Sequence, residues 1–493
     1  MGEIKLSNVS YKYDNQDTPV FDKLNLILHD DWKLGIVGRN GKGKTTLLKL
    51  ISGEIKGTGV VKCNANVQYF PYAVEENQTV LNIYQSLSQE PLWKFTKELQ
   101  SIGIHKTIIN RTFSTLSGGE KTKVLLAILF LDENSFKLID EPTNHLDEFG
   151  SESMINYLNQ KTGFIVVSHN SFLLRKICDH VLAFEKNTIR LHRGTYDSYA
   201  KQKNIEADLI ADANKKIDTK IKSLKSVSNH NKRWSMKKEA TKINKTGDPN
   251  KKAGDKGKIG KNAAKLMKKS KLADKKLEKE INKQKTLKHE TYAIDDLVIK
   301  ANDNPIRTLI NFSAFSLGYS GELFNPISLT IENGDVVGII GENGAGKTSL
   351  LNQILGNFGG KTYGNLSVNQ KLKISTIFQS YHHDENINEY IEKEDVDRTI
   401  FLNNLHKLGV ARNDFNKKIS EMSLGQQKRI ELARSLAQRA DLYLWDEPLN
   451  YLDLYNQKQL LKLIKENEIT MIIIDHNRDF LATVCNKEIE LNI

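Results

Sequence analysis

A glycine-rich segment, Gly38-Arg-Asn-Gly-Lys-Gly-Lys44-Thr45, recurs later in the chain as Gly341-Glu-Asn-Gly-Ala-Gly-Lys347-Thr348. An acidic segment, Ile139-Asp-Glu-Pro-Thr-Asn-His-Leu-Asp147, recurs as Trp445-Asp-Glu-Pro-Leu-Asn-Tyr-Leu-Asp453. The lysine of the first segment precedes the first aspartate of the second by 96 residues in one copy and 99 in the other, so the chain contains one domain twice. In each copy a short apolar run enters the glycine-rich turn and a helix-forming stretch follows. This order predicts an α/β domain with a largely parallel sheet.

The repeats divide the chain into two domains and a linker. We expect the first domain to span residues 1–198, the linker 199–300 and the second domain 301–493. Within the linker, apolar residues from Ile205 to Val227 recur every three or four positions, which is typical of one face of a long helix. Glycines and Pro249 interrupt this pattern. The linker is therefore predicted to be an α-helical hairpin with its tip near residues 240–260 and arms of about 30 residues, or roughly 45 Å.

The excess positive charge of the chain lies in this linker. Residues 201–290 contain 28 Lys and Arg against 11 Asp and Glu, a net charge of +17, and the other residues carry −5. Concentrated basic residues favour a polyanionic partner, because each neutralised phosphate releases counterions. The alternative is a solvated linker that is extended by its own charge repulsion.

Composition and hydropathy exclude several classes of protein. No apolar run approaches the roughly 18 residues that span a bilayer, and the amino terminus has no signal-peptide pattern. The three cysteines are far apart, which excludes a disulfide framework and a zinc-ligand spacing. We therefore expect a cytoplasmic protein without a membrane segment.

The glycine-rich segments have the pattern of phosphate-binding loops. Backbone N–H groups of such a loop converge on phosphates at a helix N-terminus, where the helix dipole favours an anion. Lys44 and Lys347 would neutralise the terminal phosphates of ATP, and Thr45 and Thr348 would supply hydroxyls to Mg²⁺.

Acidic pairs follow an apolar run in each copy. Asp140 and Asp446 would hold Mg²⁺, whereas Glu141 and Glu447 would orient and deprotonate the attacking water. His169 and His476 each end a further apolar run about 30 residues beyond the aspartate. The matched positions favour a contact of these histidines with the γ-phosphate over a purely structural role.

Together with Leu116-Ser-Gly-Gly-Glu120, these segments resemble the ATP-binding-cassette ATPases, whose signature sequence lies between the phosphate loop and the acidic strand. The resemblance implies that two cassettes stack head to tail, so that each ATP lies between one phosphate loop and the signature of the other cassette. Site one is then formed by cassette one with the signature residues Ser423 and Gly425, and site two by cassette two with Ser117, Gly118 and Gly119.

The resemblance also implies the remaining nucleotide contacts, including an adenine-stacking aromatic residue before each loop and a metal-binding glutamine, Gln379. The ATP-binding set at site one is Tyr13, Gly38, Asn40, Gly41, Gly43, Lys44, Thr45 and Thr46. The corresponding set at site two is Tyr319, Gly341, Asn343, Gly344, Gly346, Lys347, Thr348 and Ser349.

Three positions depart from the family pattern, and all bear on site one. The second signature has Leu424 where the first has a glycine and Gln426 where the first has Glu120. Tyr72 stands where the second cassette has Gln379. A bulky residue in the signature obstructs close approach of the backbone to a phosphate. We therefore expect site one to hydrolyse ATP more slowly than site two.

The whole chain resembles the ABC-F family, whose members act on the ribosome. Neither cassette carries the additional helical arm of several ABC-F translation factors, and in this respect the chain is similar to the antibiotic-resistance branch of that family. This resemblance implies binding to the E site of the 70S ribosome beside the P-site tRNA. The linker would reach toward the peptidyl-transferase centre in 23S rRNA and displace lincosamides, pleuromutilins or streptogramin A. It also implies a functional monomer in which the two cassettes pair. Two alternatives remain open: an ABC-F translation factor acting on stalled ribosomes, and a paired ATPase subunit of a transporter.

Basic and aromatic residues of the linker are the candidates for contact with RNA. Arg233 and Trp234 offer a guanidinium and an indole for stacking on bases, although packing between the hairpin helices is an equal alternative for the tryptophan. The candidate lysines are Lys251, Lys252, Lys256, Lys258, Lys261, Lys265, Lys268 and Lys269.

Overall fold

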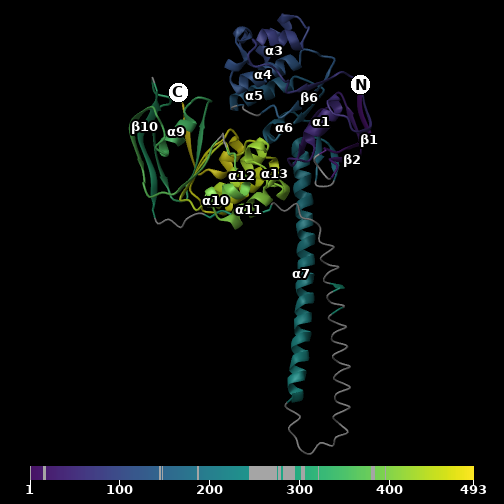
Figure 1. Cartoon of the computed structure of the whole chain (residues 1–493), viewed down its shortest axis with the longest axis vertical. Coiled ribbons are helices and arrows are strands. Elements are labelled where there is room, and N and C mark those ends of the chain that lie inside the picture. The colour runs from purple at the N-terminus through teal and green to yellow at the C-terminus, as the bar shows by residue number, and fades with distance from the viewer. Residues whose placement is uncertain are drawn as a thin grey trace, which may run out of the picture. The chain divides into compact units, whose positions relative to one another are not determined.

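The computed structural model describes residues 2–14, 18–143, 146, 148–185, 188–243, 275, 279–280, 295–300, 306–319, 321–378, 383–394 and 396–492, with backbone alone for 148–149 and 227–243. The chain divides into two units (Figure 1). One unit combines Met1–Tyr199 with Ile294–Ile493 and so contains both cassettes, and the other spans Ala200–Ala293.

Each cassette contains a mainly parallel sheet. In cassette one the described strands follow the order β5-β6-β7-β3-β8-β9, and only the β8–β9 pair is antiparallel. In cassette two they follow β14-β15-β16-β12-β17, and every pair is parallel. The strands of cassette one are β3 (Lys33–Gly38), β5 (Val67–Phe70), β6 (Phe136–Asp140), β7 (Phe164–Val167), β8 (His180–Phe184) and β9 (Ile189–Arg193). Those of cassette two are β12 (Val336–Gly341), β14 (Ile374–Ile377), β15 (Leu442–Asp446), β16 (Met471–Ile474) and β17 (Lys487–Leu491).

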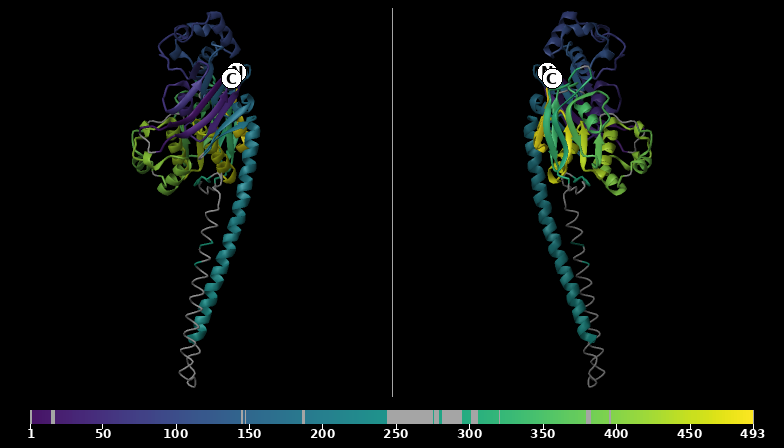
Figure 2. Two further views of the ribbon diagram at one scale, coloured as in Figure 1. Left: turned by 90° about the vertical axis from the view of Figure 1, so that its right-hand side faces the viewer. Right: turned by 90° about the vertical axis from the view of Figure 1, so that its left-hand side faces the viewer.

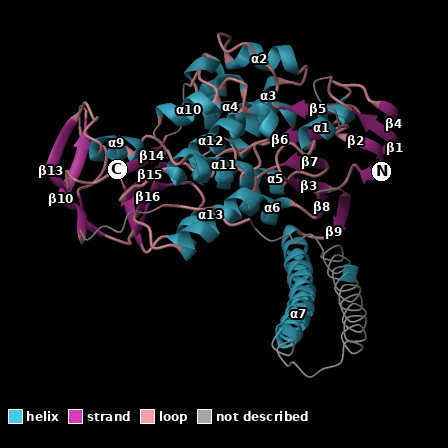
Figure 3. Cartoon of the chain, turned by 60° about the horizontal axis from the view of Figure 1, so that its bottom comes forward, coloured by secondary structure: helices cyan, strands magenta, loops and turns pink. Residues whose placement is uncertain are grey.

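Helices flank these sheets (Figure 3). The central strands β7 and β16 are apolar at every position and fully buried, as expected for parallel strands covered on both faces. The helices of cassette one are α1 (Lys44–Ser52), α2 (Val80–Leu87), α3 (Leu92–Ser101), α4 (Gly118–Leu129), α5 (Glu148–Asn159) and α6 (Ser171–Ile177). Those of cassette two are α9 (Lys347–Ile354), α10 (Ile387–Lys393), α11 (Arg398–Lys407), α12 (Leu424–Ala437), α13 (Leu454–Glu466) and α14 (Arg478–Val484). Short 3-10 helices are η1 (Lys106–Asn110), η2 (Phe113–Thr115), η3 (Arg412–Asp414) and η4 (Ile419–Glu421). The predicted fold class, two α/β ATP-binding-cassette domains in tandem, is confirmed.

The linker begins as a single continuous helix, α7 (Tyr196–Ile243), which is the long teal helix in both views of Figure 2. Its 48 residues correspond to roughly 72 Å, so this arm is longer than the predicted 45 Å because the helix extends beyond the apolar pattern at both ends. Within that pattern Ile221 is buried, whereas Ile205 and Leu209 are exposed, so the stripe is covered only along part of the helix. The expected tip near residues 240–260 lies almost entirely outside the described residues.

Each cassette also carries a small antiparallel sheet with a bulge. The sheets are β2-β1-β4, formed by β1 (Glu3–Tyr11), β2 (Phe21–His29) and β4 (Thr58–Cys63), and β11-β10-β13, formed by β10 (Thr308–Gly318), β11 (Ile327–Glu332) and β13 (Lys361–Val368). In the second sheet Ala314 has φ 44° and the opposing Gly364 has φ 71°. A Cβ atom on Gly364 would lie 1.9 Å from the carbonyl oxygen of Ala314, so this strand pairing requires glycine.

Replacing Gly364 by alanine is therefore expected to destabilise the protein more than replacing Gly356. Both glycines have positive φ, which costs alanine about 1–2 kcal/mol, but the Cβ of Gly356 would have no neighbour within 4 Å. Thermal unfolding of the two variants followed by calorimetry measures the difference. Equal decreases in Tm would contradict the steric argument.

Candidate functional site

The two phosphate loops have the same conformation. Each loop ends in a glycine with left-handed backbone, Gly43 with φ 94° and Gly346 with φ 88°, directly before α1 or α9. The ammonium of Lys44 donates to the carbonyl oxygens of Gly38 at 2.8 Å and Arg39 at 3.2 Å. That of Lys347 donates to Gly341 at 2.6 Å and Glu342 at 2.8 Å. Each lysine is thus held inside its own loop at a helix N-terminus, the arrangement that suits a bound phosphate.

A threonine hydroxyl and an aspartate meet beside each loop. Thr45 donates to Oδ2 of Asp140 at 2.7 Å, and Thr348 donates to Oδ2 of Asp446 at 2.7 Å. Asp446 is fully buried, and its Oδ1 has no hydrogen-bond partner among the described residues. A carboxylate with an unpaired oxygen next to a hydroxyl fits Mg²⁺, which is usually held by one or two carboxylates together with phosphate oxygens and water.

The glutamates that follow these aspartates have a constrained backbone. Glu141 has φ 49° and Glu447 has φ 48°, and their N–H groups donate to the carbonyl oxygens of Val167 and Ile474, at the ends of β7 and β16. Left-handed backbone is unfavourable for such residues and is concentrated at functional sites. The turn directs both carboxylates toward the strand ends that carry the histidines.

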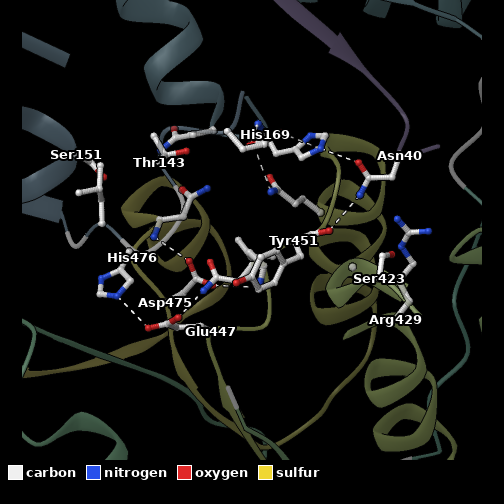
Figure 4. A pocket seen from close by; sticks show the side chains of 18 of the residues that line it. Asn40, Thr143, Ser151, His169, Ser423, Arg429, Glu447, Tyr451, Asp475 and His476 are labelled. Carbon is white, nitrogen blue, oxygen red and sulfur yellow. Dashed lines mark hydrogen bonds and ion pairs between the residues drawn. The ribbon is translucent and has the colours of Figure 1, made fainter. Parts of the chain in front are cut away.

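The two histidines make different contacts. Nε2 of His169 lies 2.8 Å from Oδ1 of Asn40 and 3.3 Å from Oε1 of Glu141. Nε2 of His476 lies 3.1 Å from Oε1 of Glu447. Figure 4 shows the pair of His169 with Asn40 and the pair of His476 with Glu447 on separate parts of the cavity wall.

The pKa values of the glutamates consequently shift in opposite directions. Burial raises the pKa of Glu141 to about 8, although the charge of Lys44 opposes the shift. Burial also favours a higher pKa for Glu447. The hydrogen bond and the charge of His476 outweigh this effect, so the pKa of this carboxyl is lowered. Burial also lowers the pKa of His169, whereas the contact with Glu447 overcomes burial and raises that of His476.

One cavity of about 1400 Å³ contains most of the predicted residues of both sites. Its lining includes Tyr13, Asn40, Gly41, Gly43, Lys44, Thr45, Thr46, Asp140, Glu141, His169, Ser423 and Gly425. It also includes Tyr319, Asn343, Gly344, Gly346, Lys347, Thr348, Ser349, Asp446, Glu447 and His476. Ser117 and Gly119 line a separate hollow together with Asn343. Gly38, Gly341 and Gly118 line neither space, and Gln379 lies outside the described residues.

The phosphate loop of cassette one contacts cassette two beside the second signature. The backbone N–H of Asn40 donates to Oδ2 of Asp453 at 2.8 Å, and its side-chain amide donates to the carbonyl oxygen of Tyr451 at 3.1 Å. A Cβ atom on Gly425 would lie 3.2 Å from that same carbonyl, so the signature backbone passes close to the contact. Site one is thus bordered by both cassettes.

The serine of each signature is the N-cap of the helix that follows. Oγ of Ser117 accepts from the N–H of Glu120 at 3.2 Å, and Oγ of Ser423 accepts from that of Gln426 at 3.3 Å. In return the side chains of Glu120 and Gln426 accept from the serine N–H groups, which completes a capping box at both helices. The exposed first turns of α4 and α12 therefore keep N–H groups available for an anion.

Of the three residues that depart from the family pattern, Gln426 lines the cavity, whereas Leu424 and Tyr72 do not. Leu424 is 59% exposed at the start of α12, and Tyr72 is half-buried. A tyrosine hydroxyl does reach the aspartate of site one, in addition to the hydroxyl of Thr45, but it belongs to Tyr69, which donates to Oδ2 of Asp140 at 3.1 Å. The alternation of side chains along β5 could have identified Tyr69. This residue pairs with Leu138, which lies two residues before Asp140 and therefore on the same face of β6.

Sequence reasoning also missed a buried lysine in cassette two. The ammonium of Lys428, on α12, donates to the carbonyl oxygens of Asp446 at 3.2 Å and Phe378 at 3.3 Å. Burial lowers its pKa to about 8. The first signature helix has Thr122 at this position, so the lysine distinguishes the surroundings of the two aspartates.

The structure describes the predicted adenine-stacking residues with their side chains, but it describes the predicted RNA-binding residues only in part. The hydroxyl of Tyr13 lies 3.0 Å from that of Thr46, and Tyr319 is exposed beside Phe358. Arg233 and Trp234 lie on α7, of which only the backbone is described at these positions. The lysines predicted at the tip lie outside the described residues.

The opposite shifts of the two glutamates predict different pH profiles for the single-site variants. With the expected role of the glutamates as general bases, Glu447→Gln should leave only site one working, and Glu141 should become able to accept a proton as the pH rises through about 8. Its ATPase rate should increase about tenfold between pH 7 and pH 9. In Glu141→Gln the remaining Glu447 is already ionised at pH 7, so the rate should stay nearly constant. Steady-state phosphate release measures both profiles, and superimposable curves would refute this assignment.

Comparison with known proteins places the chain in a family. The ABC transporter family model matches residues 21–144 and 324–450. The chain is 28% identical to the ribosome protection protein VmlR of Bacillus subtilis, over 99% of this chain and 86% of that protein. It is 26% identical to the erythromycin resistance ATP-binding protein MsrA of Staphylococcus epidermidis, over 99% and 97%.

A solved structure agrees with the fold. The archaeal ribosome recycling factor aABCE1, crystallised with the ribosomal stalk protein aP1, aligns with a TM-score of 0.63 and 17% identity, over 98% of this chain and 87% of that chain. Among the described residues, no helix has the length and apolar character of a bilayer span. The chain belongs to the ABC transporter family, whose nucleotide-binding domain it carries twice, and it is a P-loop ATPase.

Proposed function

We propose that this chain is an ATP-dependent ribosome-protection protein that confers antibiotic resistance. It binds the E site of the 70S ribosome next to the P-site tRNA. Its linker extends toward the peptidyl-transferase centre in 23S rRNA, where it displaces lincosamides, pleuromutilins or streptogramin A. The protein works in the cytoplasm as a monomer, since one chain carries both cassettes.

The observation that carries this proposal is the similarity to VmlR across nearly the whole chain, linker included. The linker carries a net charge of +17 over residues 201–290, and the rest of the chain is slightly acidic. A basic arm joined to cassettes that together carry a slight negative charge suits a large RNA partner. A transporter subunit has no evident use for such an arm, which makes that alternative the weaker one.

ATP binding is proposed to close the cassettes on two nucleotides. Lys44 and Lys347 bind the terminal phosphates, and the signature serines Ser423 and Ser117 face them from the opposite cassette. Mg²⁺, held by Thr45 and Asp140 at site one and by Thr348 and Asp446 at site two, supplies charge neutralisation at the phosphates.

Hydrolysis is proposed to depend on the glutamates and histidines. Glu141 and Glu447 orient a water molecule and accept its proton. His169 and His476 contact the γ-phosphate and fix the position of the neighbouring carboxylate. Separation of the cassettes after hydrolysis releases the protein from the ribosome.

Ribosome binding by a hydrolysis-deficient variant tests the partner. The Glu141→Gln/Glu447→Gln protein with ATP should co-sediment with 70S ribosomes in a low-salt sucrose gradient, and a variant that also carries Lys44→Ala and Lys347→Ala should not. Expression of the wild-type chain in a sensitive host should raise the minimum inhibitory concentrations of the three drug classes. Co-sedimentation without any resistance would favour the translation factor, whereas a nucleotide-loaded protein that remains at the top of the gradient would refute the ribosomal role.

Deleting residues 245–258, at the predicted tip, should abolish resistance while part of the ribosome binding remains. The cassettes and the basic arms supply most of the phosphate contacts, and the tip supplies the reach toward the drug site. Inhibitory concentrations and co-sedimentation of the same variant measure the two effects separately. Full resistance in the deletion variant would exclude a role for the tip.

A further inference from the structure

The phosphate loop of cassette one contacts cassette two through a residue beyond the nucleotide site. The guanidinium carbon of Arg39 lies 3.6 Å from the ring centroid of Tyr455, in the first turn of α13. At this distance the cation interacts directly with the face of the ring. Arg39 lies between Gly38, whose carbonyl accepts from Lys44, and Asn40, which is bonded to Asp453. The stacked pair is therefore continuous with the loop that binds phosphate.

The other end of the Tyr455 side chain holds the chain where it enters cassette two from the linker. The backbone N–H of Asp295 donates to the Tyr455 hydroxyl at 2.9 Å, and this hydroxyl donates to Oδ2 of Asp295 at 3.1 Å. One turn further along α13, Gln459 donates to the carbonyl oxygen of Asp295 at 2.9 Å. One aromatic side chain thus contacts the phosphate loop with its ring and residue 295 with its hydroxyl.

Residues 295–300 are fixed to cassette two over their whole length. Asn404, on α11, accepts from the N–H of Val298 at 2.9 Å and donates to its carbonyl oxygen at 2.7 Å. Leu297 is buried in the core of cassette two, and Lys300 pairs with Asp397 at 2.6 Å. A displacement at Asp295 is therefore shared by a packed segment and is not absorbed by a free loop.

The sequence of the other site does not provide the same contact. Glu342 occupies the position of Arg39 in the second phosphate loop, and Phe149 occupies that of Tyr455 after the first acidic segment. A carboxylate is repelled by the negative face of an aromatic ring, and phenylalanine has no hydroxyl. The series of contacts from a phosphate loop to residues 295–300 therefore starts from the loop of site one and has no counterpart in the sequence of site two.

We infer that Tyr455 is a positioning residue that couples the nucleotide state of site one to the returning end of the linker. A nucleotide at site one fixes the loop that carries Arg39, the loop fixes the Tyr455 ring, and the hydroxyl fixes residues 295–300. Such coupling is a free energy shared by two distinct sites, so it is measurable as a change at one site that depends on occupancy of the other. The inference concerns ATP binding alone and stands apart from the ribosomal role.

Hydrogen exchange of the full-length Glu141→Gln/Glu447→Gln protein, with and without ATP, tests the coupling. In this parent, ATP should slow exchange of the amides of residues 296–300. Adding Tyr455→Phe keeps the ring for Arg39 but removes the hydroxyl from Asp295. Because this hydroxyl forms two hydrogen bonds with Asp295, its loss should reduce the ATP-dependent slowing by at least about two- to tenfold, the factor expected for a single lost hydrogen bond, while nucleotide affinity stays unchanged. The matched control Tyr363→Phe, also in cassette two, should behave as the parent does.

Variants of the two phosphate-loop lysines show which nucleotide site causes the slowing of exchange. Adding Lys44→Ala to the parent should abolish the ATP-dependent slowing, whereas Lys347→Ala should leave it in place. A purely structural role of Tyr455 would speed exchange equally with and without ATP, so an unchanged ratio in Tyr455→Phe overturns the inference. An ATP-dependent slowing that persists in the Lys44→Ala variant also overturns the inference.

Discussion

The nucleotide sites depend on one contact, the hydrogen bond between a threonine in the first turn of a helix and an aspartate at the end of a neighbouring strand. Thr45 and Asp140 form it in cassette one, and Thr348 and Asp446 form it in cassette two, both at 2.7 Å. The contact requires a glycine-ended loop before the helix and a buried parallel strand beside it. Gly43 and Gly346 meet the first requirement, and apolar parallel strands that are covered on two faces meet the second. The loop lysine, the glutamate and the histidine are all placed relative to this pair.

The two sites are nevertheless chemically unequal. The aspartate of site one receives a second hydroxyl from Tyr69, whereas the main chain at Asp446 is held by a buried lysine, Lys428. The histidine of site one bonds to Asn40 of its own phosphate loop, and that of site two bonds to Glu447. The duplicated architecture thus provides two environments in which similar side chains have different proton affinities.

Much of this arrangement follows from the sequence. Strand, glycine-rich turn and helix at repeated spacing predicted the fold class, and the loop lysines, threonines and acidic pairs do converge on the cavity. The contact of Tyr69 with Asp140 did not follow, because which tyrosine reaches this aspartate is decided by the pairing of β5 with β6 and not by the motif. Leu424 points to solvent because of the rotational phase of α12, which the signature alone does not specify. Contacts such as that of Arg39 with Tyr455 join residues more than 400 positions apart and depend on the packing of the cassettes.

The capping boxes at α4 and α12 affect how signature variants are interpreted. Ser117 and Ser423 each satisfy a backbone N–H of their own helix, and truncating an N-cap serine to alanine costs about 1 kcal/mol of helix stability. An alanine variant would therefore loosen the first turn of the helix as well as remove a hydroxyl from the nucleotide. Aspartate would preserve the cap but place a negative charge against the phosphate. Threonine retains both the cap and the hydroxyl, so a comparison of threonine with alanine separates helix architecture from nucleotide recognition.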